Sequence, residues 1–228
     1  MRVNREWINI SDLMAGLMMV FLFISIVFMR NVQEDKKAMA EIALEVQKSK
    51  VQLNNDLNEE FKEDLIEWEA KILPDNTVRF KEPDILFARS SHEIKKKFKE
   101  ILRNFFPRYI DILTKQDYKN DIEEIRIEGH TSSTGKEDAT REESYLFNAQ
   151  LSQKRALSVL NEVYMLPKIE LHREWLEKVI RANGLSFAKL IMTNGIEDKP
   201  SSRRVDFRVI TKTEEKIYQI IKKSKIKP

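Results

Sequence analysis

A run of seventeen residues without a charged side chain, Leu13 to Met29, most constrains how this chain can fold. As a helix rising 1.5 Å per residue, the run is about 26 Å long, which is close to the hydrocarbon thickness of a bilayer. A buried helix of a soluble domain would need a matching apolar segment to cover it, and the sequence offers none. We therefore expect residues 1–30 to form a short N-terminal segment and one transmembrane helix.

A cleaved secretory signal is the alternative interpretation, because Arg2 and Arg5 give the chain a basic start. The run is longer than the roughly 7–15 apolar residues of a signal core, and Phe28-Met29-Arg30 provides no cleavage site of small residues. These features favour an uncleaved anchor. The flanking charges do not decide its orientation, since acidic residues count little in the positive-inside rule.

One carboxylate, Asp12, lies at the leading edge of the run, and extending the run back to Ile8 places it inside the span. A charged side chain there costs roughly 2.5–3.5 kcal/mol on insertion scales, so a functional role as an ion relay is the first hypothesis. Favourable first-turn electrostatics, with Ser11 as the N-cap, is the open alternative. We expect Ser25 to be a hydroxyl bonded back to its own helix rather than an ion ligand.

The rest of the chain is polar, with 34% of all residues charged, yet the net charge is only +3. This balance does not indicate a nucleic-acid partner. The absence of cysteine excludes disulfides and thiolate metal sites. With 3 His and 5 Gly, the sequence shows no catalytic triad, metal cluster or phosphate-binding glycine loop. We expect neither an enzyme nor a bound cofactor or metal.

After the anchor, residues 31–74 are expected to form a helical linker. The helix is predicted over residues 31–70, and Pro74 would interrupt it. Its heptad pattern is short, so a stalk that pairs with a second copy and a lone helix both remain open.

Beyond the linker, strands and helices alternate, which predicts an α/β sandwich with one mixed sheet covered by helices over residues 75–212. Thr140 and Glu143 have the spacing of a capping box at the start of the longest helix. A basic tail, 213–228, follows. The expected strands are 77–80, 84–87, 122–128, 187–192 and 204–210, and the expected helices are about 91–113, 141–164 and 170–182.

Three motifs in this region carry a resemblance: Gly129-His130-Thr131, then Asn148-Ala149-Gln150-Leu151-Ser152-Gln153-Lys154-Arg155-Ala156, then Arg203-Arg204-Val205. Together they resemble the OmpA-like peptidoglycan-binding domain. The resemblance implies that this domain binds the diaminopimelate-containing stem peptide of the wall. The residues it implies are Thr131, Ser132, Phe147, Asn148, Leu151, Arg155 and Arg203.

The residue types and spacing of the second motif indicate its chemistry without the resemblance. Asn148, Leu151 and Arg155 share one helix face by their spacing. The guanidinium fork of arginine suits a carboxylate, and the resemblance implies that Arg155 meets the carboxylate of diaminopimelate. A structural ion pair is the alternative for Arg155. For His130 a structural role is the better interpretation, and Leu151 is expected to face the core.

One position departs from the pattern of this family. Ser132 stands where the family has an aspartate, so the carboxylate expected to hold the ligand's amine is missing. We considered Asp138, Glu142 and Glu143 as replacements, because the segment before the motif helix is longer than usual.

The anchor also carries a resemblance, in Asp12-Leu13-Met14-Ala15-Gly16-Leu17-Met18-Met19-Val20-Phe21-Leu22. This segment, followed by the OmpA-like domain, resembles the MotB class of stator subunits and most of all the ZorB family of Zorya anti-phage defence systems. The resemblance implies a dimer inside a pentamer of a multi-span ZorA-like partner. The helix would cross the bacterial inner membrane once, with the N-terminus cytoplasmic and the domain periplasmic. Asp12 would relay protons rather than sodium. A flagellar stator subunit and a purely structural wall tether remain alternatives.

Overall fold

The computed structural model describes residues 3–81, 86–88, 91–135 and 138–212, with side chains from residue 10 onwards except residue 42. Asp84 and Ile85 of one expected strand, and the expected basic tail, lie outside these described residues. The side chains of residues 1–9, which include Arg2 and Arg5, lie outside them as well. A compact globular unit spans Gln47–Lys212, and the residues up to Val46 belong to a separate unit.

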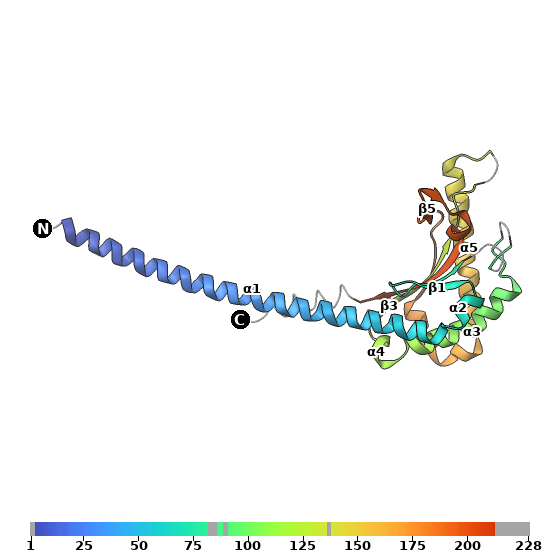
Figure 1. Ribbon diagram of the computed structural model, residues 1–228, viewed down its shortest axis with the longest axis horizontal. Helices are drawn as coiled ribbons and strands as arrows, with labels where there is room; N and C mark the ends of the chain where they lie inside the picture. Colours follow the sequence, from blue (N-terminus) through green and yellow to red (C-terminus); the bar gives the residue numbers. More distant parts are fainter. Residues whose placement is uncertain (1–2, 82–85, 89–90, 136–137, 213–228) are drawn as a thin grey trace. The chain divides into compact units, whose positions relative to one another are not determined.

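A single helix, α1, runs from Val3 to Phe61 (Figure 1). Its N-terminal part holds the charge-free run, and every large apolar side chain from Leu13 to Met29 is more than half exposed. By length and composition this is a helix able to cross a membrane, and it is the one such helix among the described residues. An apolar surface of this size needs a lipid or protein environment to cover it.

The C-terminal end of α1 belongs to the globular core. Leu53, Leu57 and Phe61 lie one above the other at four-residue spacing, and at most 2% of each is exposed. The helix was expected to reach residue 70, but it ends at Phe61. A short helix, α2 (Asp64–Glu67), and a strand, β1 (Ala70–Ile72), follow. Pairing of β1 with the next strand replaces the last expected helical turns.

The main sheet has five strands in the order β1-β2-β7-β3-β4. The four strands after β1 are β2 (Val78–Lys81), β3 (Ile122–His130), β4 (Ile180–Gly184) and β7 (Arg204–Thr211). β3 and β4 are parallel, whereas every other neighbouring pair is antiparallel. The predicted mixed sheet is therefore confirmed, and so are its strands near residues 78, 125 and 207.

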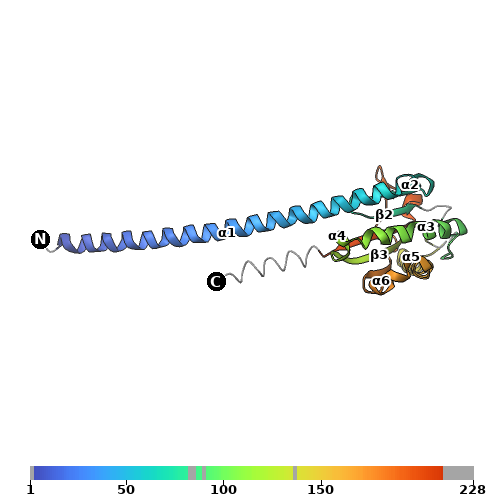
Figure 2. The ribbon, with the colours of Figure 1, turned by 90° about the horizontal axis from the view of Figure 1, so that it is seen from below.

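The remaining elements connect these strands, and the long helices pack on one face of the sheet (Figure 2). They are α3 (Lys96–Leu113), α4 (Gln116–Lys119), α5 (Arg141–Tyr164), the 3₁₀ helix η1 (Pro167–His172), α6 (Arg173–Val179), the hairpin strands β5 (Met192–Thr193) and β6 (Ile196–Glu197), and α7 (Lys199–Ser202).

An aromatic cluster fills the core between helices and sheet. The ring of Phe105 on α3 lies 5.1 Å from each of the rings of Phe61, Phe80 and Phe207, and 5.0 Å from that of Tyr109. All five side chains are fully buried. These contacts tie α1, α3 and two strands into one core, and aromatic pairs of this kind stabilise beyond their buried area.

Several local expectations were wrong. The helix expected near 170–182 is divided into η1, α6 and the first residues of β4, because Ile180–Gly184 pairs with β3. Residues 187–192 form no strand of the main sheet. The helix α3 begins at Lys96 rather than near residue 91, and it contains Pro107. Of the strand expected at 84–87, the described residues Leu86 and Phe87 are buried, and Phe87 forms an isolated bridge with Ile94.

Candidate functional site

The helix α5, which carries the central sequence motif, is fixed at its start and along its length. Thr140 caps it by accepting from the Glu143 backbone N–H, and the Glu143 carboxylate accepts from the Thr140 N–H at 2.9 Å, as the predicted capping box requires. Gly129 and Gly184 face its backbone so closely that a Cβ on either would lie 2.3 Å from a backbone atom of Ser152 or Gln153. Glycine at both positions therefore lets α5 lie directly on β3 and β4.

Asn148 holds the loop that follows β3. Its amide donates to the Ser144 carbonyl at 2.9 Å and to the Thr134 carbonyl at 3.1 Å, and only 3% of the residue is exposed. Thr131 and Ser132 in the same loop are equally buried, and the Thr131 backbone N–H donates to the Ser186 carbonyl at 2.9 Å. Among the described atoms the buried Thr131 hydroxyl finds no hydrogen-bond partner. Asn148 thus positions the loop.

Arg155 lies beneath the segment that precedes α3. Its Nε donates to the Ser91 carbonyl at 2.9 Å, and its guanidinium carbon lies 4.8 Å from the centre of the Phe87 ring. Only 3% of Arg155 is exposed. The cation–π contact stabilises the charge in this buried position. Arg155 is therefore almost closed off from solvent in this structure.

The other predicted residues lie around these two points. Leu151 and Phe147 are half-buried on α5, and Arg203 is half-buried in the turn between α7 and β7. Of the acids considered as replacements for the missing aspartate, Glu143 is engaged in the helix cap, and Asp138 is exposed with a positive φ of 60°. Glu142 is exposed on the first turn of α5.

Sequence reasoning missed one acidic residue at this loop, Glu197. Its Oε1 accepts from the Ser133 backbone N–H at 2.9 Å, and its Oε2 accepts from the Ser133 hydroxyl. Glu197 ends the β5–β6 hairpin, whose turn residues Asn194 and Gly195 both have positive φ, 53° and 79°. The Asn-Gly pair is a hairpin signal that could have been read from the sequence, whereas the contact with Ser133 could not.

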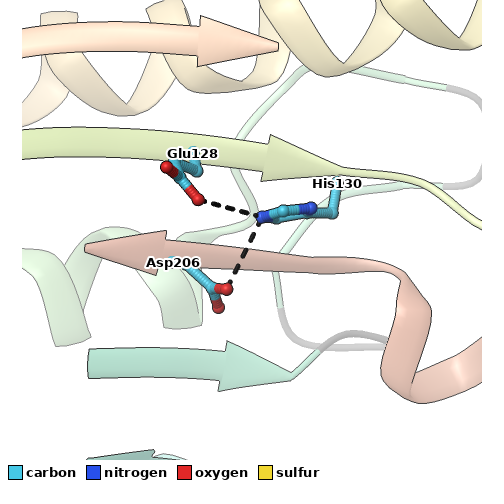
Figure 3. Close-up of side chains that lie close together, drawn as sticks. All are labelled: Glu128, His130 and Asp206. Atoms are coloured by element: carbon cyan, nitrogen blue, oxygen red, sulfur yellow. Dashed lines mark ion pairs between the residues drawn. The ribbon is translucent and has the colours of Figure 1, made fainter. Parts of the chain in front are cut away.

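The face of the sheet that is turned away from α5 carries a buried charged cluster made of Glu128, His130 and Asp206 (Figure 3). The imidazole Nε2 lies 3.5 Å from an oxygen of each carboxylate. Asp206 also pairs with Arg79 through two contacts of 2.8 and 2.9 Å, and with Arg204 at 3.1 Å. No more than 4% of Glu128, His130 or Asp206 is exposed.

The pKa of each group in this cluster is shifted by burial and by its charged neighbours. Burial lowers the pKa of His130, although Glu128 and Asp206 oppose this shift. Burial disfavours the charged form of Asp206, but Arg79 and Arg204 hold the pKa of that carboxyl below its usual range. For Glu128, the pKa-raising effect of burial is likewise outweighed, chiefly by His130.

Each of the three side chains offers one atom that could ligate a metal, and these atoms all lie within 4.8 Å of one another. Two arginines already satisfy Asp206, and a third, Arg208, lies 4.0 Å from Glu128. A dication here would add positive charge to an arrangement whose carboxylates are already neutralised. The geometry therefore fits a structural ionic cluster better than a metal centre.

Comparison with known proteins decides the family. The chain is 44% identical to the Zorya protein ZorB of Escherichia coli over 220 residues, which cover 96% of this chain and 93% of that protein. It belongs to the ZorB family. Residues 86–199 match the model of the OmpA family, so the globular part of this ZorB-family chain is an OmpA domain, as the motifs predicted.

Two solved structures resemble this ZorB-family chain. A MotB-like protein from Desulfovibrio vulgaris is 20% identical, covers 73% of this chain and 96% of its own, and has a TM-score of 0.53. The cell wall anchor of the type VI secretion system from Pseudomonas aeruginosa is 21% identical over 68% of this chain and 97% of its own, with a TM-score of 0.46. The first match confirms the predicted MotB-like fold.

Proposed function

We propose that this chain is the ion-conducting stator subunit of an inner-membrane anti-phage defence complex, anchored to peptidoglycan through its OmpA domain. One observation carries the proposal. A chain of the ZorB family holds a carboxylate, Asp12, at the edge of the apolar part of α1, and the same helix ends in the core of an OmpA domain. The same chain thus carries a candidate ion site and a candidate wall-binding domain.

In this proposal Asp12 relays protons. A charged group beside a 17-residue charge-free run is costly to place in a membrane, so a functional role is the default hypothesis, and a carboxylate can take up a proton to remove its charge. Each cycle of protonation would let a multi-span ZorA-like partner, expected as a pentamer around a dimer of this chain, move by one step. The N-terminus would be cytoplasmic and the OmpA domain periplasmic.

The relay is tested by Asp12→Asn in cells that carry the whole defence system. The variant keeps the shape of the side chain and loses its proton-binding charge, so we expect phage plaques at the level of cells without the system. Asp35→Asn, beyond the apolar run on the same helix, is the matched control and should protect normally. Membrane fractionation and cross-linking check that insertion and dimer formation are unchanged. Full protection with Asp12→Asn would favour a purely structural tether.

Wall anchoring is proposed to use α5 and the loop after β3. Asn148 fixes that loop, and Arg155 offers a guanidinium fork, once the Ser91 segment makes room, to a stem-peptide carboxylate. Leu151, Phe147, Thr131, Ser132 and Arg203 are proposed to surround the peptide. Co-sedimentation of the full chain with purified peptidoglycan should weaken for Arg155→Lys, which keeps the charge and loses the fork. Unchanged sedimentation would refute the role of Arg155.

A further inference from the structure

The loop after β3 receives a carboxylate from a distant part of the chain. Glu197 lies 64 residues beyond Ser133, yet both of its oxygens accept hydrogen bonds from that residue, one from the backbone N–H at 2.9 Å and one from the hydroxyl. The carboxylate is therefore fixed one residue away from Ser132, where this chain lacks an acidic side chain.

The segment that carries Glu197 is itself well held. The Asp198 backbone N–H donates to the Ile191 carbonyl at 2.8 Å, and the Ile191 N–H donates to the Ser202 hydroxyl at 2.9 Å. The first bond closes the base of the β5–β6 hairpin, and the second ties the hairpin to α7. A carboxylate on a closed hairpin keeps its place before a ligand arrives, and pre-organisation of this kind lowers the entropic cost of binding.

Glu197 has no ion-pair partner among the described residues, because no lysine, arginine or histidine nitrogen there lies within 4.0 Å of its carboxylate. Asp206, by contrast, is paired with Arg79 and Arg204. Each carboxylate oxygen has two acceptor positions, and Ser133 uses one on each. Glu197 is half-buried, so solvent or a ligand still reaches it.

We propose that Glu197 binds the ammonium group of the diamino acid in the wall stem peptide. This inference rests on the proposed wall-binding function and names the residue that selects the amine. An ammonium donor between the free acceptor positions of a pre-positioned carboxylate forms charge-assisted hydrogen bonds, which are stronger than neutral ones. Glu197 thus supplies, from β6, the negative charge that Ser132 does not.

The rival role for Glu197 is a latch that only ties the hairpin to the loop. Two variants separate the roles. Glu197→Gln removes the charge and keeps an oxygen that accepts from the Ser133 N–H. Ser133→Ala removes the hydroxyl contact and keeps the charge. A latch is weakened by both changes, whereas an ammonium site loses its selectivity only with Glu197→Gln. Glu142→Gln, an exposed acid on α5, serves as the matched charge control.

The experiment measures binding of the full chain in detergent to two purified muropeptides. One has a free amine on its diamino acid, and the other has that amine acetylated. We expect the wild type, Ser133→Ala and Glu142→Gln to prefer the free amine by at least about tenfold, the lower end of the effect of one hydrogen bond to a charged group. Glu197→Gln should bind both muropeptides equally.

Three other results are decisive. If Glu197→Gln keeps the preference for the free amine, Glu197 is not the amine site. If the wild type binds both muropeptides equally well, this inference fails and wall binding stands. If the wild type binds neither muropeptide, the proposed wall-binding function fails and this inference fails with it.

Discussion

The end of α1 should be as important for the stability of the OmpA domain as any of its strands. Phe61 is fully buried, with its ring 5.8 Å from that of Trp68 and 5.1 Å from that of Phe105. The guanidinium of Arg108 lies 4.8 Å from the centre of the same ring. Phe61→Ala removes all three contacts and leaves a cavity between α1, α3 and the sheet.

The expected cost follows from this burial. Replacing a fully buried phenylalanine by alanine destabilises by about 3–5 kcal/mol. In a domain the size of Gln47–Lys212, each kcal/mol lowers the melting temperature by about 2–4 °C, so the predicted decrease is about 6–20 °C. Val51, on the same helix and 52% exposed, provides the control, and Val51→Ala should change stability by less than about 0.5 kcal/mol.

The assay is thermal and urea unfolding of the fragment 47–212, followed by circular dichroism. A shorter fragment, 75–212, lacks Leu53, Leu57, Phe61 and Trp68. Burial of four such side chains contributes about 6–12 kcal/mol, similar to the whole stability of a typical domain. The shorter fragment should therefore be unfolded at 25 °C. Equal melting temperatures for Phe61→Ala and Val51→Ala, or a cooperatively folded 75–212 fragment, would refute the assignment of α1 to this core.

Three further predictions concern the same fragment. Asp206→Asn leaves Arg79 and Arg204 without their buried counter-charge and should cost about 3–5 kcal/mol in urea unfolding; a cost below 1 kcal/mol would contradict the ionic cluster. His130 has a lowered pKa, so its contribution is complete above its ordinary value of 6.5 and is lost as the pH falls through the folded value. Wild-type stability should therefore drop on acidification below pH 6.5 more steeply than that of His130→Gln, and parallel pH profiles would contradict this. Thr140→Ala removes the α5 cap and should cost about 1 kcal/mol, whereas Thr193→Ala on the exposed hairpin should cost little; equal effects would count against the capping box.

The elements that could be predicted from the sequence are those with strong local signals. The bounds of α5 follow from a capping box at Thr140 and a long helical pattern, and β7 follows from the alternation of Val205, Phe207 and Val209. By contrast, β4 has no local alternation, and its parallel pairing with β3 is a long-range contact. A helix was predicted there because only the local pattern was visible.

Only part of the candidate site could likewise be predicted from the sequence. The motif places Asn148 and Arg155 on one helix, and the structure has both on α5, but their burial depends on Thr134, Phe87 and Ser91, which no spacing rule connects to them. The contact between Ser133 and Glu197 joins a loop to a hairpin far along the chain. Such contacts depend on tertiary structure, so sequence patterns alone do not reveal them.

The close approach of α5 to the sheet has a mechanical consequence. Gly129 and Gly184 bring strand backbone against helix backbone at Ser152 and Gln153, with no side chain between them. A load applied to the outer side of α5 would therefore pass to β3 and β4 through main chain rather than through side chains that can change rotamer. From β3 the load continues through the hydrogen-bonded strands to β1, which follows α1 in the chain. In the proposed role of a wall anchor, the domain would gain stiffness under repeated pulling from two residues that have no side chain.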